Sequence, residues 1–121
     1  MQKTTVDKTF SWLLVLGGIL HGVGTFKAFD AGTSSFVWSL AGSFAAILLA
    51  AINLMRVNRP GDVMLARVCL AGCLCWIVIA LMFNQSIHNM LDPRGLYHAI
   101  AALVLAWFSF QNIMKAPVPK L

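Results

Sequence analysis

Hydrophobic residues gather into four long runs along the chain, and most polar residues lie between these runs. Each run approaches the ~20 residues that an α-helix needs to cross about 30 Å of hydrocarbon. The pattern predicts four transmembrane helices, at about 10–27, 35–55, 63–84 and 96–114. The connections are too short to hold a soluble domain. We therefore expect one domain over residues 1–121, an all-α integral membrane protein folded as a four-transmembrane-helix bundle.

Residues that commonly begin a helix stand before three of the runs. Asp62 follows a Pro-Gly pair, Asp92 precedes Pro93, and a Thr-Ser-Ser segment occupies 33–35. Oxygen atoms of such side chains accept hydrogen bonds from the free N–H groups of a first helical turn, and proline suits that turn. These residues predict where the last three helices begin.

Small and polar residues recur every three or four positions within each run, which places them on one face of each helix. In lipid, small residues and interhelical hydrogen bonds bring helices together, because apolar surface alone does not. We therefore expect these faces to pack against one another. In chain order they contain Ser11, Gly18, His21, Gly22 and Thr25; Ser39, Gly42, Ser43, Ala46, Ala50 and Asn53; Cys69, Gly72, Cys73, Trp76, Ala80 and Asn84; and His98, Ala101, Ala102, Ser109 and Asn112.

The second and fourth runs resemble each other. Residues 38–56 align without a gap with 97–115, so that an aromatic residue begins both segments, Asn53 meets Asn112 and a basic residue ends both. The first and third runs match poorly. The alignment predicts two repeated helical hairpins related by a parallel pseudo-twofold axis along the membrane normal.

Charge and composition bear on location and partners. The chain is 60% hydrophobic and 11% charged, which does not suit a soluble domain. The net charge is +5, but the lysines and arginines form no basic stripe, so we expect no nucleic-acid partner. Seven cations fall at the end that holds both termini, and two at the other: Lys3, Lys8, Arg56, Arg59, Arg67, Lys115 and Lys120, against Lys27 and Arg94. The positive-inside rule then places both termini in the cytoplasm, and we expect a bacterial inner membrane.

A cleaved signal peptide is the alternative for the first run. Lys3 and Lys8 precede an apolar stretch, as they do in signal peptides. No good A-x-A cleavage site follows, which favours a retained helix.

The three histidines are the main candidates for a ligand site. His21, His88 and His98 all fall on the extracytoplasmic side, where Asn84 and Thr25 are close in depth. Ionisable residues inside a membrane protein are functional candidates by default. We predict an outward-facing polar pocket in which His21, His98, Asn84 and Thr25 bind a ligand.

Several chemistries suit such a pocket. His21, His88 and His98 together are candidate ligands of zinc or copper, and His21 with His98 are candidate axial ligands of a haem. The same rings suit a proton relay or a quinone headgroup. In a purely structural role, His21 would bond Thr25 or a backbone carbonyl, His98 would reach the interface and His88 would be solvated. No H-x-x-x-H spacing singles out a metal, so no cofactor is favoured, and haem and a transition metal stay open.

Other residues argue against an enzyme. Cys69 and Cys73 lie one helical turn apart, but the chain has no C-x-x-C motif, so we expect buried thiols that act as small apolar residues. No acidic residue falls inside the four runs, which disfavours a proton-coupled antiporter. No nucleophile has a supporting base and acid.

The sequence thus favours a small non-enzymatic membrane protein, either an accessory or assembly subunit or a binder of a small lipophilic ligand. A haem or metal protein is the first alternative, and a small oligomeric transporter is the second. The expected partners are the lipid bilayer and either another membrane protein or further copies of the chain.

Overall fold

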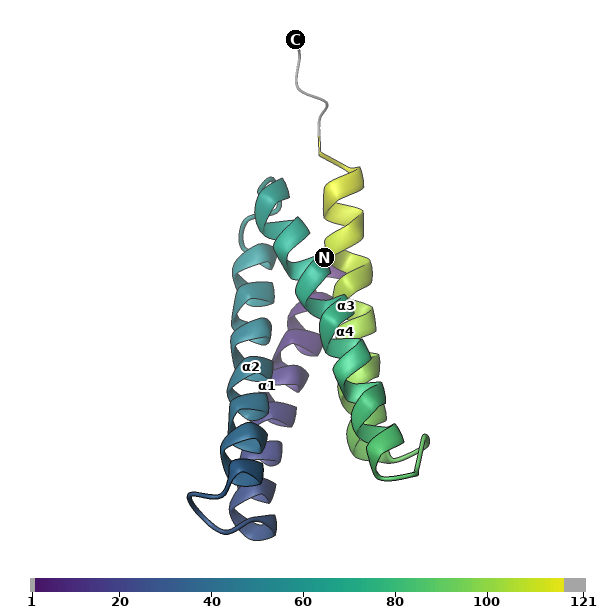
Figure 1. Ribbon diagram of the computed structural model, residues 1–121. Helices are drawn as coiled ribbons and strands as arrows, with labels where there is room; N and C mark the ends of the chain where they lie inside the picture. The colour runs from purple at the N-terminus through teal and green to yellow at the C-terminus, as the bar shows by residue number, and fades with distance from the viewer. Residues whose placement is uncertain (1, 117–121) are drawn as a thin grey trace.

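The computed structural model describes residues 2–116 and folds them into four α-helices joined by short connections (Figure 1). These are α1 (Gln2–Ala28), α2 (Ser34–Val57), α3 (Val63–Ser86) and α4 (Pro93–Met114), and the described part of the chain contains no strand. All four helices are long and apolar enough to cross a membrane. The predicted all-α architecture with four candidate membrane spans is confirmed. Lys120, which was counted in the charge argument, lies outside the described residues.

The expected caps begin the last three helices. The side chains of Thr33, Asp62 and Asp92 accept hydrogen bonds from backbone N–H groups of the first turns of α2, α3 and α4. Pro93 occupies the first turn of α4. Because Asp92 is the cap, α4 begins three residues earlier than its apolar run suggested.

The first helix is longer than predicted. It begins at Gln2, whereas hydropathy suggested a start near residue 10. Because hydropathy identifies only the residues that suit lipid, it does not detect the polar residues by which this helix extends beyond its apolar run. The extension is held by tertiary contacts of Asp7, which are described below.

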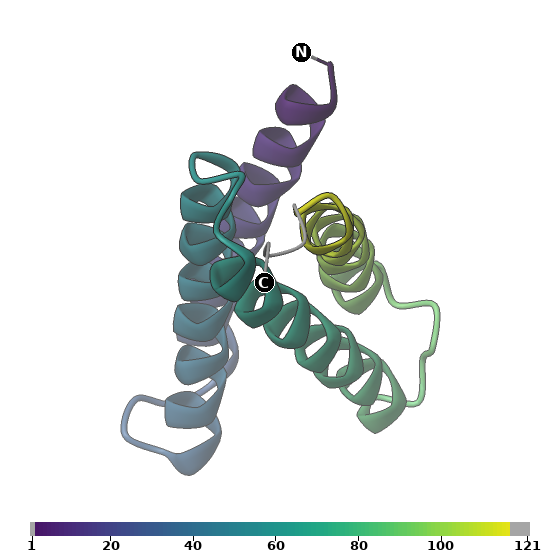
Figure 2. The ribbon, with the colours of Figure 1, turned by 90° about the horizontal axis from the view of Figure 1, so that it is seen from above.

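The helices form two hairpins, α1 with α2 and α3 with α4, and packing is closest within each hairpin. The hairpins approach each other where α2 ends and α3 begins, and they diverge toward the 29–33 and 87–92 connections (Figures 1 and 2). This arrangement agrees with two hairpin units. Their origin by duplication stays a prediction.

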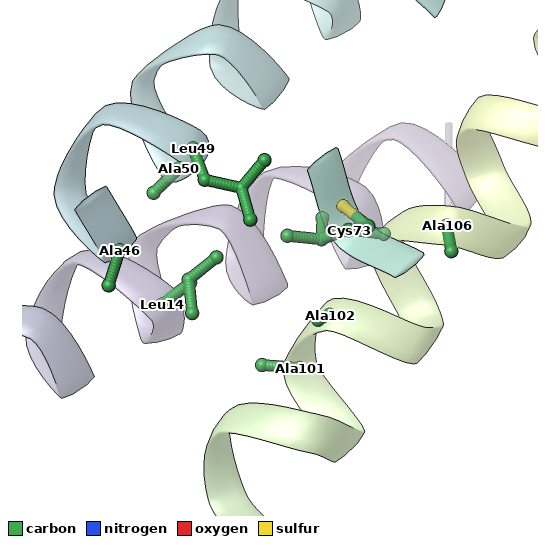
Figure 3. Packing of buried hydrophobic residues seen from close by; sticks show 9 residues of the cluster. Leu14, Ala46, Leu49, Ala50, Cys73, Ala101, Ala102 and Ala106 are labelled. Atoms are coloured by element: carbon green, nitrogen blue, oxygen red, sulfur yellow. The ribbon is translucent and has the colours of Figure 1, made fainter. Parts of the chain in front are cut away.

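Small side chains dominate the core at the junction of the hairpins, as the spacing of small residues predicted. Leu14, Leu49 and Leu105 are the large members, and alanines and Cys73 surround them (Figure 3). Gly18 shows how closely the backbones approach, because a Cβ atom there would lie 2.7 Å from Cγ1 of Ile47 on α2. Most large apolar side chains are exposed on the outside of the bundle, where lipid would cover them.

Candidate functional site

Two of the three histidines lie side by side where α1 of one hairpin meets α4 of the other. The ring centroids of His21 on α1 and His98 on α4 are 6.4 Å apart, with the planes at 81°. His21 precedes the end of α1 at Ala28, and His98 follows the start of α4 at Pro93. At 1.5 Å per residue the two rings lie about 10 Å and about 8 Å from those helix ends. The early start of α4 therefore brings His98 to the depth of His21.

A chain of hydrogen bonds fixes the ring of His21. Its Nε2 lies 3.2 Å from Oγ of Ser39, and that oxygen lies 2.6 Å from Oγ1 of Thr25. The Thr25 hydroxyl in turn donates to the backbone carbonyl of His21, at 2.9 Å. Thr25 is buried and Ser39 is half-buried, whereas the His21 side chain is exposed. The ring is thus anchored at Nε2, although the residue as a whole is exposed.

His98 is held from two other helices. Its Nδ1 lies 3.3 Å from Nε1 of Trp76 on α3, which donates the hydrogen bond. On the opposite side α1 approaches so closely that a Cβ atom on Gly17 would lie 3.2 Å from His98 Nε2. The neighbouring Tyr97 donates a hydrogen bond to the carbonyl of Leu13, at 2.6 Å. Gly17 therefore allows α4 to seat its aromatic residues against α1.

Asn84 has a different role from the one expected. Its Nδ2 donates to the carbonyls of Met90 and Asp92, at 3.1 and 3.2 Å, and so fixes the connection between α3 and α4. Its Oδ1 is buried and has no hydrogen-bond partner among residues 2–116. An added Cβ at Gly95 would collide with the Asn84 amide, so this glycine lets α4 pack over the side chain. Asn84 thus supports the site through the start of α4.

His88 stands apart from the other two histidines. It lies in the turn after α3, with a positive φ of 54°. Across residues 2–116, no three His, Cys, Asp or Glu side chains come together as a group that could hold a metal ion. The predicted three-histidine metal site is therefore not assembled in this structure.

The two remaining rings do not present nitrogens to one common point. His21 directs Nε2 to α2, while His98 directs Nδ1 to α3 and Nε2 toward α1. Axial haem ligation needs one nitrogen from each ring on opposite sides of a single iron. The arrangement fits hydrogen bonding better than coordination.

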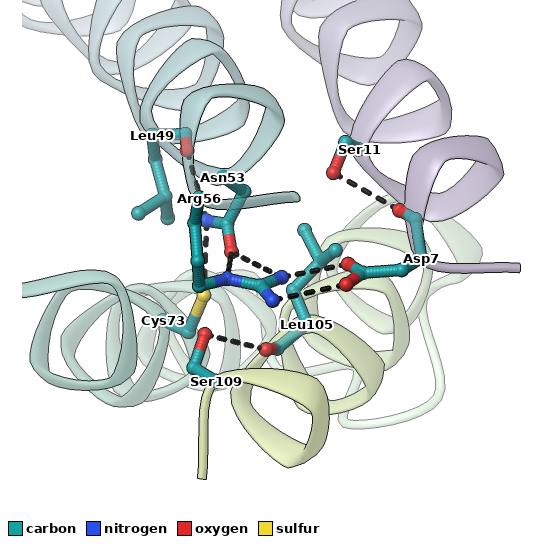
Figure 4. A network of polar contacts seen from close by, with 8 residues as sticks. All are labelled: Asp7, Ser11, Leu49, Asn53, Arg56, Cys73, Leu105 and Ser109. Carbon is teal, nitrogen blue, oxygen red and sulfur yellow. Dashed lines mark hydrogen bonds and ion pairs between the residues drawn. The ribbon is translucent and has the colours of Figure 1, made fainter. Parts of the chain in front are cut away.

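A second polar cluster lies near the other end of the bundle, and sequence reasoning missed it. Arg56 is 0% exposed and Asp7 is 6% exposed. The guanidinium binds both carboxylate oxygens of Asp7, at 2.9 and 2.6 Å, and also contacts Oδ1 of Asn53 at 3.2 Å (Figure 4). Leu105 and Ser109 of α4 lie beside this group in Figure 4.

Two expectations are corrected by this cluster. An acidic residue does lie inside a candidate membrane span, because α1 includes Asp7. Arg56 was counted with Arg59 and Arg67 among the cations at one end of the bundle, but it is enclosed by protein, whereas the other two are exposed. The missed signal was the stripe of α1, because Asp7 precedes Ser11 by one helical turn on the same face.

The cysteines behave as predicted. Cys69 and Cys73 are fully buried, and the Sγ atom of Cys73 lies 3.5 Å from Nδ2 of Asn53. Cys75 is exposed on the outside of α3. The two buried thiols fill space beside the Arg56 cluster.

Two shallow surface hollows lie away from the histidines. One follows α1 from Thr5 to Leu16, and the other lies between α3 and α4 around Leu70 and Trp107. The second is lined by apolar residues alone, whereas polar residues such as Thr5, Lys8 and Thr9 share the lining of the first. Neither hollow includes His21 or His98.

Comparisons with known proteins give no relative. No protein-family model, no curated protein and no solved structure matches this chain.

Proposed function

We propose that this protein is a small non-enzymatic integral membrane protein that binds a small lipophilic ligand between its two hairpins, with the polar end of the ligand at His21 and His98. The observation that carries this proposal is the exposed imidazole of His21, which lies beside His98 within two candidate membrane spans. A polar ring at that depth is costly when it meets only acyl chains. A ligand with a polar head would give the ring a partner, and an apolar body would suit the surrounding lipid.

The local architecture supports ligand binding over a packing role. A histidine that serves only to pack helices would be covered by its neighbours, as Thr25 and Asn84 are. His21 instead is exposed, although its Nε2 is tethered to Ser39.

The proposal includes an orientation. The bias of lysine and arginine supports a cytoplasmic position for the N-terminus, the 58–62 connection and the C-terminus, in a bacterial inner membrane. In that orientation the His21 region lies in the extracytoplasmic half of the bilayer.

Native mass spectrometry of protein purified gently from its own membrane tests the proposal. We expect a bound species of a few hundred daltons on the wild type, and its loss from His21→Ala and His98→Ala. His88→Ala is the matched control, because it removes a histidine on the same side that lies outside the pair. Thermal unfolding of each variant shows that the fold is retained. An adduct that is equally abundant on all four proteins would contradict the proposal.

A further inference from the structure

The hydrogen atoms of the His21 chain can be assigned one by one. Thr25 has a single hydroxyl hydrogen, and it goes to the carbonyl of His21, which can only accept. In the short contact between Thr25 and Ser39, Ser39 must therefore be the donor. This contact uses the only hydrogen of Ser39. Its oxygen must then accept from His21, so Nε2 of His21 carries a hydrogen.

This assignment determines whether the remaining ring nitrogen of His21 is a hydrogen-bond donor or an acceptor for a ligand. A neutral imidazole has one N–H donor and one nitrogen with a lone pair. Since Nε2 is the donor, Nδ1 of His21 is the acceptor. Within residues 2–116 the ring makes one hydrogen bond, through Nε2. Because His21 is exposed, the ring nitrogen left for a ligand is this acceptor.

His98 can be assigned in the same way. Trp76 can only donate through Nε1, so Nδ1 of His98 holds a lone pair and Nε2 carries the hydrogen. That N–H lies against α1 at Gly17. Neither histidine thus directs a free N–H toward a ligand, because one N–H is bonded to Ser39 and the other is covered by α1.

We propose that the ligand carries a hydroxyl group that donates its hydrogen bond to Nδ1 of His21, which makes it a lipophilic phenol or alcohol. This inference rests on the ligand-binding function proposed above. A hydroxyl hydrogen matches the lone pair of Nδ1. A ligand whose polar head holds only carbonyl or ether oxygens would set one acceptor against another, and such a pair forms no hydrogen bond.

A matched pair of probes tests this chemistry. 4-Octylphenol and 4-octylanisole differ by one methyl group that replaces the hydroxyl hydrogen. Binding of each probe to the full-length protein in lipid nanodiscs is measured by equilibrium dialysis. We expect the phenol to bind about five- to tenfold more tightly than the ether, as one net hydrogen bond allows.

Variants test whether the preference for the phenol over the ether depends on Nδ1 of His21. His21→Phe keeps an aromatic ring and removes the acceptor, so the two probes should bind it equally. His88→Phe is the control, and it should keep the wild-type preference. Ser39→Ala removes the group that fixes the tautomer, so we expect the preference to fall while binding persists.

The outcomes separate this inference from the proposed function. If wild type binds both probes equally and His21→Phe loses both, the site exists but the hydroxyl inference is wrong. If both probes bind equally to every variant, or bind to none, the proposed function fails and the inference fails with it. A tighter complex with the ether also contradicts the inference.

A measurement on the wild type guards against a variant that misfolds. Nitrogen NMR of protein labelled with ¹⁵N-histidine reports which ring nitrogen carries the hydrogen. We expect His21 to show a protonated Nε2 and an unprotonated Nδ1 at pH 8. A hydrogen on Nδ1 instead would overturn the inference whatever the variants do.

Discussion

Removing the charge of Arg56 should strongly destabilise the protein. Arg56→Met keeps a long side chain and leaves the buried carboxylate of Asp7 without its cation. The pair is 0% and 6% exposed, and the two N–O distances are 2.9 and 2.6 Å. Breaking a buried ion pair by removing one partner costs about 3–5 kcal/mol. We expect a loss of that size, because Oδ1 of Asn53 also loses its donor.

The double variant distinguishes loss of the pair from loss of packing. Asp7→Asn alone leaves the guanidinium unpaired, so it should cost a similar amount. When both changes are combined, no buried charge remains, and the cost should not exceed that of the worse single variant. Arg59→Met is the control, since Arg59 is exposed in the neighbouring connection and its loss should change stability by less than about 0.5 kcal/mol.

Unfolding by SDS in mixed micelles, followed by far-UV circular dichroism, measures these free energies. The reasoning is refuted if Arg56→Met costs less than about 1 kcal/mol, well below the buried-pair range. Additive losses in the double variant would also refute it, because they would mean that the two side chains act independently.

Two further predictions concern close packing and pH. A Cβ on Gly17 would lie 2.7 Å from Cε1 of Tyr97. Gly17→Ala should therefore destabilise the fold by about 1–3 kcal/mol through overpacking and lower the thermal midpoint. Gly24→Ala is the control and should be neutral or stabilising, because a Cβ on Gly24 would meet nothing within 4 Å. The hydrogen bonds of Arg94 hold the pKa of Asp92 below its ordinary value of 3.8, so this carboxylate stabilises the fold above that pH and loses its contribution as the pH falls through the lowered pKa. The difference in thermal midpoint between wild type and Asp92→Asn should therefore be present at pH 7 and shrink below about pH 4; a difference that is constant with pH would contradict this assignment.

Local chemistry explains why much of the fold was predictable. The four apolar runs predicted the number of helices, and the three capping residues predicted where the last three begin. Both features depend on nearby residues alone, namely the length of an apolar run and the hydrogen bonds at a helix start. The stripes of small residues indicated which faces meet, and Gly22 and Thr25 are buried as expected. His21 lies on the same stripe and is exposed. Its exposure depends on how whole helices pack, which no short pattern specifies.

The candidate site was predictable only in part, for the same reason. Depth follows from position along a helix, so His21 and His98 could be expected on the same side of the membrane, but their common depth required the earlier start of α4 at Pro93. The partners of each ring depend on the rotation of neighbouring helices. Trp76 and Ser39 emerged as these partners only in three dimensions. Asp7 was missed because hydropathy treats the polar start of α1 as a flank, although the helix continues through it.

The two polar clusters differ in whether their polar groups are all paired within the protein, and this difference bears on function. At Arg56 every charge meets a counter-charge inside the protein, so that cluster needs nothing from outside and fixes one end of the bundle. At His21 the hydrogen bonds among Thr25, Ser39 and His21 use both hydroxyl hydrogens and the imidazole N–H, and they leave Nδ1 of His21 as an unused acceptor. A completed network stabilises, whereas a network with one open position is prepared for a further partner. His21 lies about 20 Å along α1 from Asp7, so we expect binding at this end to leave the packing at the Arg56 end unchanged.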